Sequence, residues 1–208
     1  MLKNKLVYAF GDSIIYGHTA PEKSFMKMLS SEEGFRLGMY AVNGATVMKG
    51  ENDIITQIEN APKEKPDVII FDGYTNDAYE RNMGSVGEFT ESVTADFDET
   101  TFCGGFDKII SMMKDKWQGV PIIYVTIHRS AGRDFMIQLK LRERALWICE
   151  KWDIEVLDIF ARAELDTRDK EQMDRYIMGQ AGSHPNEEAC RKYYMPLMKK
   201  KLIGVFEK

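Results

Sequence analysis

Ser13 is a candidate nucleophile for acyl transfer. It follows an apolar run at residues 5–10 and stands in the sequence Gly11-Asp12-Ser13-Ile14. Glycine permits a tight exit from a strand, and the side chain of Asp12 can hydrogen-bond its own loop. A serine just past the carboxyl end of a parallel strand lies where an α/β sheet binds its ligands. The alternative is that Ser13 only caps the helix that follows.

His184 is the histidine best placed to activate that serine. It lies in the sequence Gly182-Ser183-His184-Pro185, directly before the last helical stretch. From such a loop an imidazole can reach over the sheet and take the serine proton as general base. His18 and His128 are weaker candidates, and His128 ends the fourth apolar run, where it could line the same pocket. The three histidines have no regular spacing, so we expect no zinc site.

Two further segments offer hydrogen-bond donors for the negative charge that develops during acyl transfer. Gly44 follows the second apolar run and can present a bare backbone N–H group. Asn76 follows the third run, in the sequence Asp72-Gly73-Tyr74-Thr75-Asn76-Asp77. Its side-chain amide can donate to an oxyanion. Taken singly, each segment is also compatible with an ordinary turn.

Strands and helices alternate along the chain, and they must position these residues. Five short runs rich in apolar, β-branched or aromatic residues predict strands at residues 5–10, 37–42, 67–71, 121–127 and 155–159. Two apolar stripes at helical spacing lie between them, namely Phe106, Ile110, Met113 and Trp117, and then Ile137, Leu141, Ala145, Ile148 and Trp152. This alternation predicts βαβ units and a doubly wound parallel sheet, with ligands beyond the carboxyl ends of the strands.

Capping residues and one proline predict where helices begin and break. Asp134 is expected to cap the helix of the second stripe. Asn52 or Asp53 is expected to cap the helix that begins directly after these two residues. Pro196 lies inside the helical stretch 186–203, where we expect a kink or a break.

Residues 78–105 interrupt the regular alternation. They lack clear periodicity and are rich in acidic residues, glycine, serine and threonine. A connection this long in a compact domain is usually functional or mobile. The segment could be a lid, a wall of the substrate site or a solvated excursion from a single domain that spans residues 1–208.

Composition excludes several classes of protein. The net charge of −5 argues against nucleic-acid binding, and no apolar stretch approaches the ~20 residues that span a bilayer. Three cysteines, Cys103, Cys149 and Cys190, form no CxxC pair, which suits a reducing compartment. The first ten residues lack the features of a signal peptide, so a cytoplasmic location is expected. The sequence indicates no oligomeric state.

The order of these motifs resembles that of the SGNH, or GDSL-type, hydrolase superfamily over nearly the whole chain. The family's nucleophile motif matches residues 11–14, its oxyanion glycine and asparagine match Gly44 and Asn76, and its histidine matches His184. The resemblance implies a three-layer α/β/α, flavodoxin-like fold with a five-stranded parallel sheet. It also implies serine-dependent ester hydrolysis without a cofactor or metal, with the oxyanion held by the N–H groups of Ser13 and Gly44 and by the Asn76 amide.

Two positions depart from the family pattern. Tyr74 stands where the family usually has glycine, and Ala181 stands where it usually has the aspartate of the catalytic triad. That carboxylate orients the imidazole and stabilises the imidazolium that forms during catalysis. A backbone carbonyl or another acid, such as Asp174, could orient His184 instead. Asp12, Tyr74 and His128 are further candidates to line the pocket.

These observations favour an esterase or deacylase that acts on a small-molecule ester, with a short acyl group such as acetyl on a polar or carbohydrate carrier. The alternative is a catalytically weak or inactive binding protein that kept the pocket, because Ala181 replaces the usual acid. A flavodoxin-like nucleotide or flavin binder would share the architecture, but the chain lacks a glycine-rich phosphate loop.

Overall fold

A parallel sheet of five strands forms the centre of the computed structural model, which describes residues 1–179 and 182–207. The strands are β1 (Leu6–Phe10), β2 (Arg36–Met39), β3 (Val68–Asp72), β4 (Ile122–Val125) and β5 (Glu155–Leu157). Their order in the sheet is β2-β1-β3-β4-β5, and every neighbouring pair is parallel. The inner strands β1, β3 and β4 are buried at every position, which explains their continuous apolar sequences.

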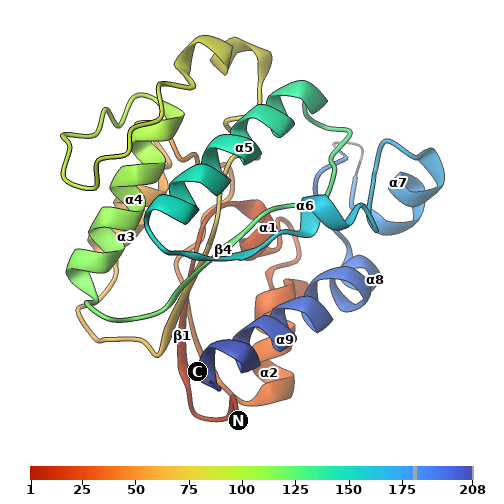
Figure 1. Cartoon of the computed structure of the whole chain (residues 1–208). Helices are drawn as coiled ribbons and strands as arrows, with labels where there is room; N and C mark the ends of the chain where they lie inside the picture. Colours follow the sequence, from red (N-terminus) through yellow and green to blue (C-terminus); the bar gives the residue numbers. More distant parts are fainter. Residues whose placement is uncertain (180–181, 208) are drawn as a thin grey trace.

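Helices cover both faces of the sheet (Figure 1). On one face, α3 (Ile54–Asn60), α4 (Phe102–Lys116) and α5 (Phe135–Lys151) pack side by side. On the other lie α1 (Ser13–Tyr16), α2 (Phe25–Glu33) and α9 (Met195–Phe206). Shorter helices are α6 (Ile159–Arg162), α7 (Lys170–Tyr176) and α8 (Glu187–Ala189), with 3-10 turns at Pro21–Lys23 and Glu80–Ser85. The three-layer α/β/α prediction is confirmed.

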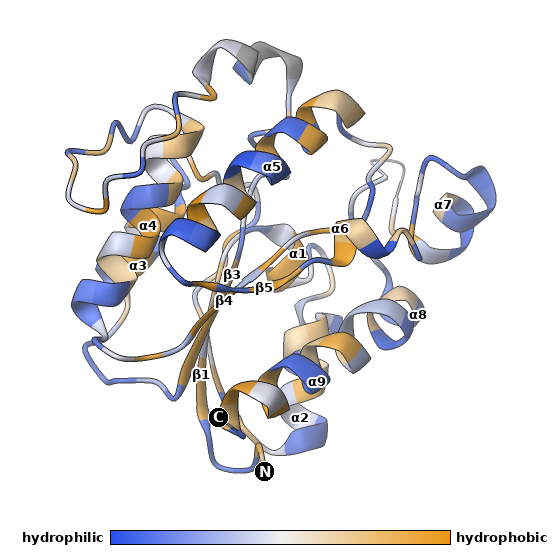
Figure 2. Cartoon of the chain, in the orientation of Figure 1, coloured by the Kyte–Doolittle hydropathy of each residue, from blue (hydrophilic) through white to orange (hydrophobic). Residues whose placement is uncertain are grey.

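Both predicted helical stripes face the core. The residues of the first stripe are all buried, three of them in α4 and Trp117 at its end. The residues of the second stripe that lie in α5 are buried as well, and Trp152, which follows this helix, is half-buried. Figure 2 shows the strands largely in the hydrophobic colour, with hydrophilic residues on the outer helices and around α7. Asp134 caps α5 by accepting a hydrogen bond from Ile137 N at 2.9 Å. Asp53, rather than Asn52, caps α3 through Thr56 N at 2.7 Å.

The C-terminal helical stretch does not break before Pro196 but passes through π-helical geometry, in which Met195 N donates to Cys190 O. After α8 the chain forms a π-helical segment, Cys190–Tyr194, and α9 begins at Met195. Pro196 thus occupies the first turn of α9, where its missing N–H group costs no intrahelical hydrogen bond.

The connection after β3 is pinned to the helical layer. The predicted excursion 78–105 begins with the 3-10 turn Glu80–Ser85 and ends inside α4, which starts at Phe102. Lys151 of α5 donates to Thr90 O at 2.8 Å and forms an ion pair with Asp107 at 2.5 Å, with both side chains at most 3% exposed. This buried contact holds the middle of the segment against α4 and α5.

Among the described residues, none of the helices has the length and apolar character needed to cross a bilayer.

Candidate active site

Gly11 makes the sharp exit from β1 that delivers the candidate nucleophile. Its φ of +134° lies in the region that favours glycine, and a Cβ atom there would lie 1.8 Å from Asp72 Oδ1. The chain then turns directly into α1, of which Ser13 is the first residue. Asp12, not Ser13, caps this helix by accepting a hydrogen bond from Ile14 N at 2.8 Å. The hydroxyl of Ser13 is therefore available for another partner.

That partner is His184, which lies 171 positions away along the chain. Ser13 Oγ and His184 Nε2 are 3.0 Å apart, within hydrogen-bond distance. The loop that carries the histidine is fixed by a hydrogen bond from Met178 N to His184 O and by a bridge between Ile177 and Pro185. The structure thus joins two residues that the sequence places at opposite ends of the domain.

The environment of His184 favours a neutral imidazole. Burial, followed by the charges of His18 and Arg133, lowers the pKa of His184 to about 4. At neutral pH the ring therefore carries no charge, and Nε2 can accept a proton from Ser13 when the proton on the ring sits on Nδ1.

No carboxylate of the described residues hydrogen-bonds to His184. Ala181, the position of the usual triad acid, lies outside the described residues. Asp174, the alternative acid, is exposed on α7 and forms an ion pair with Lys170 at 2.5 Å. The ring of His184 instead stacks on the ring of His18, with centroids 3.7 Å apart and planes 3° from parallel.

Asn76 and the loop after β2 come together beside the turn that carries Ser13. Asn76 Nδ2 donates to Ala45 O at 2.9 Å and approaches Asp12 Oδ2 at 3.5 Å. Gly44 is exposed with a φ of +80°, and no heavy atom outside its immediate chain neighbours lies within 4 Å of where a Cβ would be. Gly44 and Asn76 line one hollow of about 340 Å³.

Arg133 is a site residue that the sequence analysis missed. It lies on the connection between β4 and α5, and its guanidinium donates to Thr75 O and to Asn76 Oδ1, the latter at 3.3 Å. The same group lies over the ring of Tyr79, with 4.3 Å to the centroid. The only available signal was its place after the fourth strand, at the same edge of the sheet as Ser13, because no motif marks such an arginine.

Three buried aspartates support the loops of the site. Asp12 N donates to Asp72 Oδ1 at 2.8 Å, and burial raises the pKa of Asp72 well above its ordinary value, with the neighbouring Asp12 carboxyl as the next cause. Asp77 accepts hydrogen bonds from the backbone N–H groups of Val47 and Met48. Burial raises the pKa of Asp77 to about 7. These contacts tie the turn that carries Ser13 and the loop after β2 to the segment at the end of β3.

Tyr74 occupies a backbone conformation that glycine would adopt without strain. Its φ is +106°, although its side chain is fully buried. This is the position where the superfamily pattern usually has glycine.

Asp12, Tyr74 and His128 are all fully buried. The ring of His128 hydrogen-bonds the hydroxyl of Tyr194 at 2.7 Å rather than Ser13. Their role as pocket lining stays a prediction.

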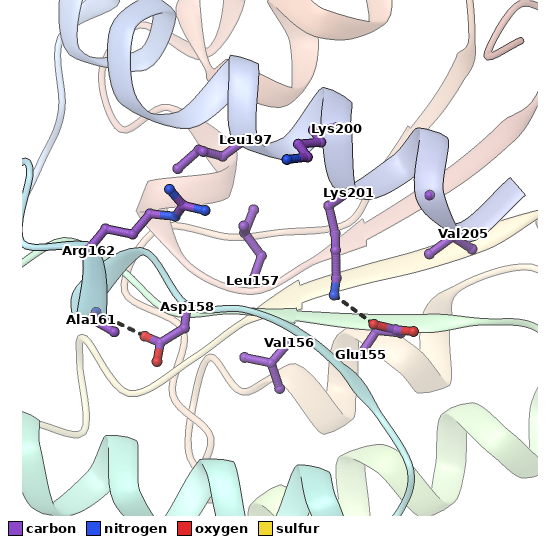
Figure 3. Close-up of a pocket in the computed structure, with 11 residues that line it drawn as sticks. Glu155, Val156, Leu157, Asp158, Ala161, Arg162, Leu197, Lys200, Lys201 and Val205 are labelled. Atoms are coloured by element: carbon purple, nitrogen blue, oxygen red, sulfur yellow. Dashed lines mark hydrogen bonds and ion pairs between the residues drawn. The ribbon is translucent and has the colours of Figure 1, made fainter. Parts of the chain in front are cut away.

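A larger hollow, of about 560 Å³, lies elsewhere, between β5, α6 and α9 (Figure 3). Leu157 and Leu197 contribute apolar surface to it, and Lys201 pairs with Glu155 at its rim at 2.6 Å. None of the candidate catalytic residues lines this hollow.

Comparisons with solved structures agree with this fold. A protein from Lactobacillus plantarum superposes with a TM-score of 0.82 at 17% identity, covering 98% of this chain and 99% of its own. Est24, a carbohydrate acetylesterase from Sinorhizobium meliloti, gives a TM-score of 0.68 at 12% identity over 96% of this chain and 99% of its own. The psychrotrophic esterase EstA from Pseudoalteromonas gives a TM-score of 0.67 at 12% identity, covering 99% of this chain and 100% of its own.

No curated protein sequence shows significant similarity to the chain. The sequence model of the GDSL-like lipase/acylhydrolase family, however, matches residues 9–192, a span that runs from the end of β1 into the π-helical segment and includes Ser13, Gly44, Asn76 and His184. The chain therefore belongs to the GDSL-like lipase/acylhydrolase family.

Proposed function

We propose that the protein is a serine-dependent hydrolase that removes short acyl groups, such as acetyl, from a polar or carbohydrate carrier. Membership of the lipase/acylhydrolase family supports ester hydrolysis in general. The observation that carries the serine mechanism is the 3.0 Å contact between Ser13 Oγ and His184 Nε2.

Acylation begins when Ser13 Oγ attacks the carbonyl carbon of the ester. His184 Nε2 takes the serine proton as the new C–O bond forms. The negative charge moves to the carbonyl oxygen, where the N–H groups of Ser13 and Gly44 and the Asn76 amide donate hydrogen bonds to it. The tetrahedral intermediate then collapses, and His184 returns the proton to the leaving alcohol.

Deacylation repeats these steps with water as the nucleophile. Neutral His184 takes a proton from the water that attacks the acyl-enzyme, and the same donors hold the second oxyanion. The C–O bond to Ser13 breaks, its oxygen regains the proton from His184, and the acid leaves. Both halves require His184 to be unprotonated at the start, which its low pKa ensures at neutral pH.

The hollow beside the oxyanion residues supports a polar carrier. The side chains around it are mostly polar or charged, namely Thr46, Lys49, Glu51, Asn52, Asn76 and Asn82, with Met48 as an apolar member. Amide, hydroxyl and charged groups recognise alcohols by hydrogen bonds, whereas a long acyl chain requires an apolar wall. The structural likeness to a carbohydrate acetylesterase agrees with this choice of carrier.

The test is hydrolysis of p-nitrophenyl acetate and octanoate, followed by a panel of acetylated sugars. We expect the acetate ester to be hydrolysed faster than the octanoate ester, and we expect Ser13→Ala to abolish hydrolysis. Ser31→Ala, an exposed serine in α2, serves as the matched control and is expected to match the parent. A fluorophosphonate probe should label the peptide that contains Ser13. Labelling of another serine, or unchanged turnover in Ser13→Ala, would contradict the mechanism.

A second candidate function is a binding protein that kept the pocket without turnover. The observation that favours it is Ala181, which removes the usual triad acid. In that case the folded protein would bind an acetylated sugar without hydrolysing it, and Ser13→Ala would leave the affinity unchanged.

A further inference from the structure

The ring of His18 lies face to face on the ring of His184. The centroids are 3.7 Å apart and the planes differ by 3°. The Ser13 hydroxyl contacts the Nε2 edge of the same ring at 3.0 Å. One contact therefore fixes an edge of the imidazole, and the other restricts rotation of its plane, because a turned ring would collide with His18.

The backbone around His18 ties it to both the nucleophile and the oxyanion loop. His18 N donates to Ser13 O at 3.0 Å, and His18 O accepts from Asn43 Nδ2 at 3.2 Å. Its φ of +51° is a left-handed conformation, in which histidine is found more often than most residues. It directly follows Gly17, the left-handed residue that ends α1. The backbone of His18 is thus held by the turn that carries Ser13 and by the loop that carries Gly44.

We propose that His18 is a positioning residue that holds the His184 imidazole in its catalytic plane. The inference rests on the proposed function of the site. It assigns to a stacked ring one of the tasks that a carboxylate performs in a triad, orientation of the imidazole. A ring stacked face to face can do this, because the imidazole cannot rotate out of its plane without colliding with it.

Two protonated imidazoles at 3.7 Å would repel each other, so a charge on His18 opposes proton transfer to His184. The charged groups of the described residues that act on His184 are His18 and Arg133, and both lower its pKa. Removing the charge of His18 should therefore raise the pKa of His184 without removing the effect of burial.

Three variants distinguish an effect of ring stacking on catalysis from an effect on folding. His18→Ala removes the ring, His18→Phe keeps a ring without charge, and Thr19→Ala changes the exposed neighbour as a control. We expect His18→Ala to lower kcat about tenfold with KM changed less than about twofold. His18→Phe should recover most of that loss, and Thr19→Ala should match the parent. Circular dichroism confirms that the variants compared are folded.

A second readout does not depend on turnover. NMR of protein labelled with nitrogen-15 in histidine follows the titration of His184 in the parent, His18→Ala and His18→Phe. We expect the pKa of His184 to be higher in both variants than in the parent. An unchanged titration, parental kcat in His18→Ala, or a His18→Phe variant as slow as His18→Ala would overturn the proposal. If the parent has no activity that depends on Ser13, the proposed function fails, whereas the titration still decides the role of His18.

Discussion

Arg133 Nη2 donates a hydrogen bond to Asn76 Oδ1 at 3.3 Å. Because the carbonyl oxygen of the amide faces the guanidinium, its nitrogen faces the loop of Gly44, where Nδ2 donates to Ala45 O. The second hydrogen of Nδ2 faces Asp12 Oδ2 across a long contact of 3.5 Å, and under the proposed function it is the donor that an oxyanion would take. Under the proposed function the guanidinium would also lie next to the developing negative charge, so Arg133 would both orient and polarise the donor.

Loss of Arg133 should slow catalysis more than it weakens binding. We expect Arg133→Gln to lower kcat by about 10- to 100-fold, less than loss of the donor itself. Arg133→Lys keeps the charge but loses the planar fork that bonds two acceptors, so it should retain intermediate activity. Steady-state kinetics on a short-chain ester checks this order. Equal kcat in all three proteins would show that Arg133 plays no part in orienting Asn76.

Asn76 is expected to act on the transition state. Asn76→Ala should lower kcat by about 10²- to 10³-fold with little change in KM, the range seen when one oxyanion donor is removed. Asn82→Ala is the matched control, because this residue lines the same hollow and donates to Asp77 O. An effect of Asn76→Ala mainly on KM would mean that Asn76 binds the substrate in its ground state.

The pH dependence should reflect the unusual pKa of the base. Burial and two neighbouring charges lower the pKa of His184 to about 4, so the active, neutral form persists well into the acid range. We expect kcat/KM for an uncharged ester to fall only as the pH drops through about 4, because kcat/KM follows ionisation of the free enzyme. Circular dichroism at each pH separates this loss from unfolding. An acid limb near pH 6.5, the ordinary value for histidine, would contradict the assignment.

Most of the site could be predicted from sequence because its residues end strands of a parallel sheet. Ser13 follows β1, and Asn76 follows β3, so the sheet itself brings them to one edge. Gly44 was also identified from the sequence as a candidate oxyanion residue. The strand before it is shorter than predicted, because β2 ends at Met39 and Val42 is exposed. These placements depend on topology, which periodicity and turn residues encode well.

The contacts of His18 and Arg133 could not be predicted, because they depend on the path of loops. The position of the His18 ring follows from a left-handed backbone at two successive residues, Gly17 and His18, which no apolar pattern records. Arg133 reaches Asn76 across two connections whose shapes are set by buried polar groups. Sequence spacing locates loops but not the direction of their side chains.

The exit from β1 should tolerate only glycine. In Gly11→Ala, the new Cβ would lie 1.8 Å from Asp72 Oδ1 at a φ of +134°. We expect this variant to lose at least about 2 kcal/mol of unfolding free energy, from backbone strain and overpacking. Gly204→Ala is the control, since this helical glycine has open space around it and should gain about 0.5–1 kcal/mol. Urea denaturation of both variants measures the difference, and equal stability would refute the steric argument.

Ala181 and His18 should be coupled if they serve the same imidazole. Position 181 lies outside the described residues, but it matches the acid position of the family, so Ala181→Asp should orient His184 through its Nδ1 atom. We expect kcat/KM to rise by a few-fold up to ~10⁴-fold, the upper end being the loss on disabling the acid of a triad. In the Ala181→Asp background, His18→Ala should then lower kcat by less than the tenfold expected in the parent, because the carboxylate already holds the ring. Kinetics of the four proteins of this cycle measure the coupling. Equal effects of His18→Ala in both backgrounds would show that the two positions act independently, and an unchanged rate in a folded Ala181→Asp variant would show that a carboxylate at this position does not reach His184.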